Sequence, residues 1–275
     1  MSEMLESSDQ SPAELEPKLT INPAVVAHRF VQAGMLLGLV WKWSFFVTSA
    51  GIYAKIPLED PFFPSWLESV WTLSLVYLGS VAAILLNLIT GSRILQRVCS
   101  AITFLGASVL CIHQGSYNDM TFVTTWWASL WSLWYVYRMD DLDQGPLLRR
   151  AAFLSRIIIS MILLGGAAGK WTGEYWSGDV LYDIYFVDRE FWLFNWMRSS
   201  MDADALRWAA TWHSRMVIAT ETIAGLGLWL LPARAAAIVA ILLLASIALM
   251  SNFFLFSVLF SLIGLAAVGL LAHDR

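Results

Sequence analysis

Residues 151–186 read AAFLSRIIISMILLGGAAGKWTGEYWSGDVLYDIYF, and this stretch divides into two parts at Lys170. The part before Lys170 is almost entirely apolar, and a helix needs about 20 such residues to cross a bilayer core of about 30 Å. The part after it mixes acidic residues with Trp and Tyr, which favour the membrane–water interface. The stretch therefore predicts a membrane-spanning helix over 151–169 that ends at an interface.

The whole sequence has the composition of an integral membrane protein. Of its 275 residues, 58% are hydrophobic and 14% are charged, whereas soluble domains carry about 25% charged residues. The mean hydropathy is +0.63. The net charge of −4 is small and gives no basic footprint for nucleic acid. We therefore expect membrane lipids as partners and no nucleic acid.

The N-terminal residues 1–22, MSEMLESSDQSPAELEPKLTIN, hold five acidic residues and one lysine. A secretory signal would begin with a basic region followed at once by an apolar stretch. The segment instead predicts a disordered acidic tail. The transmembrane domain is expected over 23–275, with Asn22 as the N-cap of its first helix and Pro23 in the first turn.

Apolar segments recur along the rest of the chain and predict an all-α, multi-pass transmembrane bundle of about eight spans. The last two segments are separated only by Ser251 and Asn252, so 235–271 fits two spans or one span with a re-entrant segment. The predicted spans are 30–53, 68–90, 97–114, 121–137, 151–169, 209–231, 235–250 and 253–271.

The basic residues predict how the bundle is oriented. The short loops opposite the N-terminal tail carry only Lys42 and Lys55, so the positive-inside rule places both termini in the cytoplasm. Lys170 and the loop 170–207 then face outward. Within that loop, REFWLFNWMRSS (189–200) is typical of an interfacial helix. The basic residues on the tail side are Lys18, Arg29, Arg93, Arg97, Arg138, Arg149, Arg150, Arg156, Arg234 and Arg275.

Lys170 has two interpretations. It follows Ala151 by 19 residues, which is about 28 Å along a helix and thus the boundary of the hydrocarbon. In the first interpretation its ammonium group extends into the headgroup layer among Trp171, Tyr175 and Trp176. In the second, the small residues of 165–169 let a helix or a ligand approach closely, and a partly buried Lys170 acts as a base.

Glu221 lies near the middle of a predicted span, in VIATETIAGLGLWLL (217–231). An ionisable group at that depth is costly and is a candidate functional residue by default. The alternative is a structural hydrogen bond or an ion pair with a cation such as Lys42. His213 lies eight residues earlier on roughly the same side of the helix, where a structural role is the alternative.

His113 and Asp119 flank a short outer loop and are further candidates. The chain contains no HxxH, HxxxH or HExxH spacing, so we expect no metal site. Cys99 and Cys111 are about 18 Å apart along one helix and are expected to be buried free thiols. The stripe of Trp127, Trp131 and Trp134 favours core packing, with a cofactor-binding face as the alternative.

The segment AAGKWTGEYWSGDVLYDIY (167–185) resembles a motif of the HTTM family, the membrane domain shared with vitamin K-dependent γ-carboxylases. Two other segments are similar to the family, DPFFPSWLES (60–69) and ALMSNFFLFSVLFSLIGL (248–265), and the resemblance covers about residues 24–271. The residues that match the lysine motif are Ala168, Gly169, Lys170, Gly173, Trp176, Gly178 and Leu181.

This resemblance implies a function for Lys170. The family's carboxylases use a lysine at this position as the base that deprotonates vitamin K hydroquinone, so a quinone or quinol is the implied cofactor or substrate. The expected outer cavity contains the small residues 165–169. Its expected catalytic residues are Lys170, Glu221 and Asp119, and its expected substrate-binding residues are Gly169, Trp171, Trp176, Gly178, His113 and His213.

Two departures from the carboxylases argue against protein γ-carboxylation. The sequence has no counterpart of their large luminal C-terminal half, and Asn118–Asp119 stands where they carry an Asn-His pair.

We expect a protein of a bacterial cytoplasmic membrane that binds or oxidises a quinol or lipid-like substrate. The alternative is a non-catalytic membrane subunit that binds a protein partner through Trp-rich faces. A transporter ranks last, because the predicted spans carry little charge.

Overall fold

The computed structural model describes residues 22–53, 69–115, 120–250 and 257–272, and all regular secondary structure in these ranges is helical. The all-α prediction is therefore confirmed. Of the features predicted from the sequence, residues 1–21 of the acidic tail, Lys55, Asn118, Asp119 and Ser251–Asn252 lie outside the described residues. So does almost all of the segment 60–69.

In the ranges that the structure describes, eight long helices lie where the apolar segments predicted helices. Between α5 and α9 the chain forms short α6 (Gly173–Ser177), α7 (Asp179–Leu181), the π-helix η2 (Tyr182–Val187) and α8 (Trp192–Ser200), and the 3₁₀-helix η3 (Leu228–Leu230) follows α9. The long helices are α1 (Pro23–Tyr53), α2 (Val70–Ile89), α3 (Arg93–Gly115), α4 (Met120–Arg138), α5 (Gln144–Gly169), α9 (Ala203–Gly227), α10 (Ala233–Met250) and α11 (Val258–Leu271).

Among the described residues, four helices, α1, α2, α3 and α5, are long and apolar enough to cross a membrane. Two shorter apolar helices, α10 and α11, lie on either side of Ser251–Asn252, which are outside the described residues. At the start of α1, the backbone N–H of Ala24 donates to Asn22 Oδ1 at 2.9 Å, so the predicted N-cap is confirmed.

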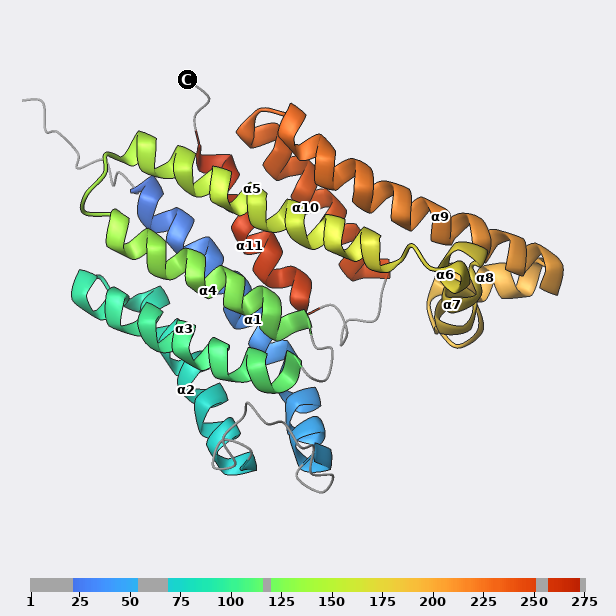
Figure 1. The fold of residues 1–275 in the computed structure, drawn as a ribbon, viewed down its shortest axis with the longest axis horizontal. Coiled ribbons are helices and arrows are strands. Elements are labelled where there is room, and N and C mark those ends of the chain that lie inside the picture. The colour runs from blue at the N-terminus through green and yellow to red at the C-terminus, as the bar shows by residue number, and fades with distance from the viewer. Residues whose placement is uncertain (1–21, 54–68, 116–119, 251–256, 273–275) are drawn as a thin grey trace, which may run out of the picture.

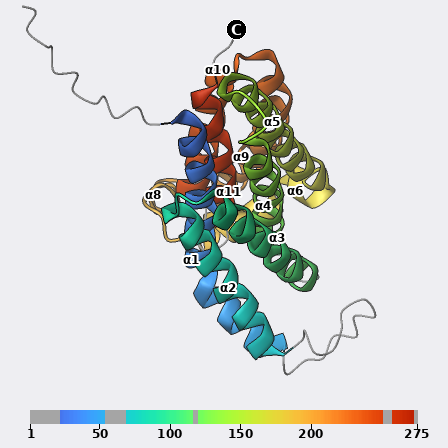
Figure 2. The ribbon, with the colours of Figure 1, turned by 90° about the vertical axis from the view of Figure 1, so that its left-hand side faces the viewer.

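Helix α1 lies at the centre of the bundle, where it packs against α11, α2 and α4 (Figure 1). Helix α5 packs against α9 and α11, and α10 packs against α11. The first turn of α1 and the last turn of α11 lie at the same end of the bundle, whereas α6, α7 and α8 lie beyond the other end of α5 (Figures 1 and 2). The segment after Lys170 therefore lies away from the first turn of α1 and the last turn of α11.

Small residues let α1 and α11 approach closely. A Cβ atom added at Gly34 of α1 would clash with the backbone carbonyl of Phe260 and would lie 3.2 Å from the Cα of Gly264. Close backbone contact of this kind increases van der Waals packing, which is a main source of helix association in lipid.

The tryptophan stripe of α4 packs into the core. Trp131 is buried, its Nε1 donates to the Ala151 carbonyl at 3.1 Å, and its ring stacks on Tyr135 at 4.6 Å. Trp127 and Trp134 are partly buried against the same core. The structure therefore supports the packing interpretation. Both cysteines are free thiols, as expected, although Cys111 is only half-buried.

Candidate functional site

The candidate site begins where α5 ends. Lys170 is the C-cap residue of α5, and its backbone N–H donates to the Ala167 carbonyl at 3.0 Å. Thr172 then caps α6, because its hydroxyl accepts from the backbone N–H of Tyr175 at 3.3 Å. Helix α5 therefore ends at Lys170, and a new short helix, α6, carries Tyr175 five residues later.

Side chains of α9 bind the end of α6. The last carbonyls of a helix have no partner within it, and here three consecutive ones accept from α9. Ser214 Oγ donates to the Tyr175 carbonyl, Arg215 Nε donates to the Trp176 carbonyl at 3.4 Å, and Thr211 Oγ1 donates to the Ser177 carbonyl at 2.5 Å. These bonds fix Tyr175 beside α9.

Gly178 permits this close contact. Its φ angle is +90°, a conformation that glycine adopts without steric cost. A Cβ atom at this position would lie 2.5 Å from the backbone N and Cα of Thr211. Gly178 thus serves the packing of α6 against α9, and it does not line the cavity described below.

Lys170 and Glu221 form an ion pair between α5 and α9. Lys170 Nζ lies 2.7 Å from Glu221 Oε1 and 2.6 Å from Oε2, and 3.4 Å from the Gly166 carbonyl. The side chains are 26% and 12% exposed. A Cβ at Gly166 would lie 3.3 Å from Glu221 Oε2. The small residue at that position leaves room for the pair, as expected for the stretch 165–169.

The ion pair forms part of the wall of a cavity of about 240 Å³. Its other walls are mostly apolar and come from α6, α7, η2, α8, α9 and α10. The lining residues are Lys170, Tyr175, Leu181, Tyr185, Phe194, His213, Met216, Val217, Thr220, Glu221, Leu243, Ser246 and Ile247. A cavity with apolar walls and a few convergent polar groups is the usual form of a small-molecule site.

Three further titratable side chains line this cavity, namely Tyr175, Tyr185 and His213. Burial raises the pKa of the Tyr175 hydroxyl above its ordinary value, and the Glu221 carboxylate and Tyr185 raise it further. Tyr175 therefore stays protonated across the physiological range and can donate a hydrogen bond. Lys170 Nζ lies 6.0 Å from the Tyr175 ring centre, at the limit of a cation–π contact.

The structure brings together Lys170, Glu221 and His213 of the predicted site residues. Glu221 pairs with Lys170 and not with Lys42, which lies over the Phe45 ring at 3.8 Å. Gly169, Trp171 and Trp176 do not line the cavity. A Cβ at Gly169 would meet nothing within 4 Å, and the rings of Trp171 and Trp176 stack on each other at 5.1 Å.

The structure does not place His113 at this site. His113 is buried near the end of α3, which packs against α2 and α4, and it does not line the cavity. Asp119 lies outside the described residues. Within the part of the chain that the structure describes, no group of three or more His, Cys, Asp or Glu side chains could hold a metal ion.

Sequence reasoning missed a second polar cluster, which joins α1, α2, α3 and α4. His28 Nε2 lies 3.0 Å from Ser132 Oγ, and Gln32 Nε2 donates to the same hydroxyl at 2.6 Å. Ser100 Oγ lies 3.3 Å from Ser132 Oγ and accepts from Asn87 Nδ2 at 2.9 Å. The signal in the sequence was His28 and Gln32, four residues apart in an apolar helix.

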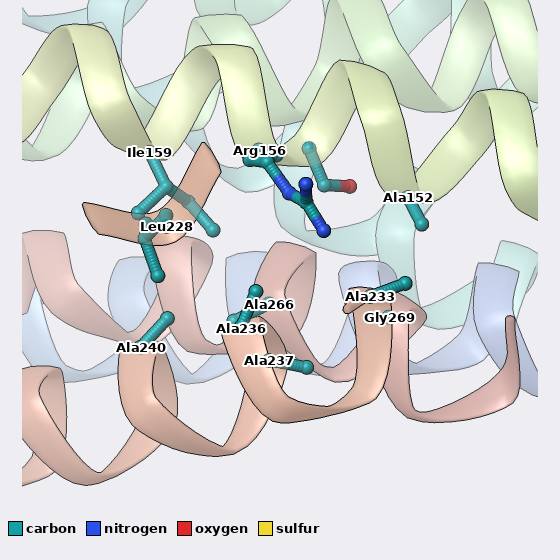
Figure 3. Close-up of a pocket in the computed structure, with 11 residues that line it drawn as sticks. Ala152, Arg156, Ile159, Leu228, Ala233, Ala236, Ala237, Ala240, Ala266 and Gly269 are labelled. Carbon is teal, nitrogen blue, oxygen red and sulfur yellow. The ribbon is translucent and has the colours of Figure 1, made fainter. Parts of the chain in front are cut away.

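A smaller cavity of about 20 Å³ lies between α5, α10 and α11, where Arg156 extends from α5 toward the alanines of α10 (Figure 3). This volume holds about one water molecule. The Arg156 guanidinium also lies 5.8 Å from the Trp229 ring centre. The space is too small for an organic substrate, so the cavity beside Lys170 is the better candidate.

Comparison with protein-family models, curated proteins and solved structures gives no match to this chain.

Proposed function

We propose that this chain is an HTTM-type bundle of eight membrane helices that binds a quinol or another lipid-like molecule with a hydroxyl group, at an outward-facing site with Lys170 as base. One observation carries the proposal: the Lys170–Glu221 pair lies in the wall of an apolar cavity of about 240 Å³. Charged groups in an apolar setting are costly and are most often retained for function.

The cavity suits an amphiphilic ligand. Met216, Val217, Leu243 and Ile247 supply apolar walls for a ring or an alkyl group. The volume lies below the roughly 300 Å³ at which drug-sized pockets begin, so it fits a single ring, with any isoprenoid chain extending into lipid. The ligand's hydroxyl would meet the ion pair.

The ion pair also suits a proton transfer. An ammonium group that donates to a carboxylate has no lone pair for a further proton. Lys170 therefore accepts a proton from the ligand's hydroxyl only after passing its own proton to a Glu221 oxygen, 2.6 Å away. The products are a phenolate, a Lys170 ammonium and a neutral Glu221, so the anion formed lies beside a cation. Tyr175 and His213 could then bind the ligand's second oxygen.

Mass spectrometry of the lipids extracted from the purified protein tests this proposal. The wild type should retain a quinone, and Lys170→Met should retain at least about tenfold less, because an unmade hydrogen bond to a charged group costs about 1.5–3 kcal/mol. Arg207→Ala is the control, since it removes a cation from an exposed pair with Asp179. Absence of a retained quinone or other hydroxyl-bearing lipid from the wild type, or equal retention by Lys170→Met, would overturn the proposal.

Exposed tryptophans favour the second candidate function, a membrane subunit that binds a protein partner. Trp192 and Trp196 lie one turn apart on α8 and are 70% and 57% exposed. Aromatic anchors of this kind are enriched at protein interfaces. A stable protein partner that co-purifies with the wild type and is lost in Trp192→Ala would support this alternative.

A further inference from the structure

Arg215 lies between two tryptophan rings on the surface of α9. Its guanidinium carbon is 5.1 Å from the Trp176 ring centre and 5.6 Å from that of Trp212. His213 and Val217, two positions away on either side, line the Lys170 cavity. Because a helix turns about 100° per residue, Arg215 points to the other side of α9, and its site is separate from that cavity.

Further tryptophans extend this arrangement at both ends. Trp171 stacks on Trp176 at 5.1 Å with nearly parallel rings, and Trp208 contacts Trp212 at 6.1 Å. Trp176 and Trp212 are 41% and 48% exposed. The five residues, here called the aromatic stack, thus form a partly open surface with one cation at its centre.

Arg215 has N–H groups that donate to no described residue. Its Nε donates to the Trp176 carbonyl, and its two terminal nitrogens have no hydrogen-bond partner among the described residues. It forms no ion pair with any acidic side chain that the structure describes, whereas Arg207, two turns earlier, pairs with Asp179 at 3.6 Å. A guanidinium with two free terminal nitrogens matches the geometry of a phosphate.

The position of Arg215 along α9 indicates the kind of anion. Before it, α9 exposes the aromatic side chains of Trp208 and Trp212, and after it the aliphatic side chains of Met216, Ile223 and Leu226. Aromatic residues favour the headgroup layer of a membrane and aliphatic residues favour its hydrocarbon. Arg215 lies at the change from one to the other, which is the depth of lipid phosphates.

We propose that Arg215, held between Trp176 and Trp212, binds the phosphate of an anionic phospholipid. The guanidinium's terminal nitrogens donate to the phosphate oxygens, and the aromatic stack contacts the glycerol and the upper acyl chain. This site does not depend on the function proposed for Lys170.

Native mass spectrometry of the full chain in detergent, titrated with phosphatidylglycerol, tests the site. We expect the wild type to bind phosphatidylglycerol more tightly than phosphatidylcholine, and Arg215→Gln to weaken phosphatidylglycerol binding roughly tenfold. Arg156→Gln is the matched control, since Arg156 also lies over a tryptophan, Trp229, but on the wall of the small cavity in Figure 3. It should bind as the wild type does.

Arg215→Lys separates lipid binding from a structural role. A lysine keeps the positive charge but loses the hydrogen bond from Nε to the Trp176 carbonyl. If the charge binds the lipid, Arg215→Lys should retain part of the lipid binding. If only that hydrogen bond matters, Arg215→Lys should lose lipid binding as Arg215→Gln does. In the wild type, high salt should weaken binding of phosphatidylglycerol and not of phosphatidylcholine. Equal binding of the two lipids, an unaffected Arg215→Gln, or displacement of the lipid by equimolar inorganic phosphate would overturn the proposal.

Discussion

Lys170 and Glu221 lie 51 positions apart in the chain and 2.6 Å apart in space. Neither charge is stable alone in apolar surroundings, because the low dielectric makes an unpaired charge costly. Together the two charges compensate each other, and the same low dielectric strengthens their attraction. At the scale of single residues, the candidate site therefore depends on a contact between two helices, and each residue needs the other.

We expect a double-mutant cycle on Lys170→Met and Glu221→Gln to give a coupling energy of about 1–3 kcal/mol. Each single variant leaves one charge without its partner, whereas the double variant removes both charges, so the double variant should be more stable than the sum of the single changes predicts. Thermal unfolding of the purified protein in detergent measures the four stabilities.

The exposed pair Arg207–Asp179 supplies the control cycle. Its atoms are 3.6 Å apart and its side chains are 61% and 60% exposed, so its coupling should stay below about 1 kcal/mol. Equal coupling in the two cycles would show that burial does not strengthen the Lys170–Glu221 pair.

At the scale of secondary-structure elements, close helix contacts decide which faces meet. Gly34 and Gly264 allow the backbones of α1 and α11 to touch, and Gly178 allows α6 to touch α9. The first contact holds the centre of the bundle, and the second positions Tyr175 at the cavity. Both helix contacts require a glycine, which has no side chain, at the point of contact. The amino-acid composition alone does not show which glycines lie at such contacts.

Gly34→Ala should lower the free energy of unfolding by about 1–3 kcal/mol, because the new methyl group would push α1 away from the Phe260 carbonyl. The comparison is Gly51→Ala on the same helix, where a Cβ meets nothing within 4 Å. That change should be neutral or stabilising by up to about 1 kcal/mol. Equal effects of the two substitutions on the unfolding temperature would contradict the close packing of α1 and α11.

At the scale of the whole molecule, the described ends of the chain lie together and the segment after Lys170 lies at the opposite end (Figure 1). An even number of membrane crossings gives this arrangement. The eight long helices of the described residues would provide an even number if each crosses the membrane once. The distribution of basic residues predicts that these ends face the cytoplasm.

Labelling with a membrane-impermeant thiol reagent tests this topology. In a background with Cys99 and Cys111 replaced by alanine, Glu174→Cys in α6 should react in intact cells. Ser92→Cys, between α2 and α3, should react only after the membrane is opened. Both side chains are exposed in the structure, so access should depend on the membrane alone. Reaction of both positions from the same side would refute an eight-span bundle.

Local sequence patterns were enough to predict the helical class, the positions of the long helices and the N-cap at Asn22. The sequence also identified Lys170 and Glu221 as candidate site residues, because a charged residue within an apolar segment can be recognised from the sequence alone. These features depend on local composition and periodicity, which a single segment carries within itself.

Which side chains meet depends on how distant segments pack together. The tertiary structure paired Glu221 with Lys170 and not with Lys42, placed His213 at the cavity and His113 elsewhere, and packed Trp131 into the core. The physical reason is that a helix in lipid is apolar on several faces, so its periodicity does not show which face a neighbouring helix covers. That choice depends on close contacts such as those at Gly34 and Gly178, which arise only when two distant segments pack together.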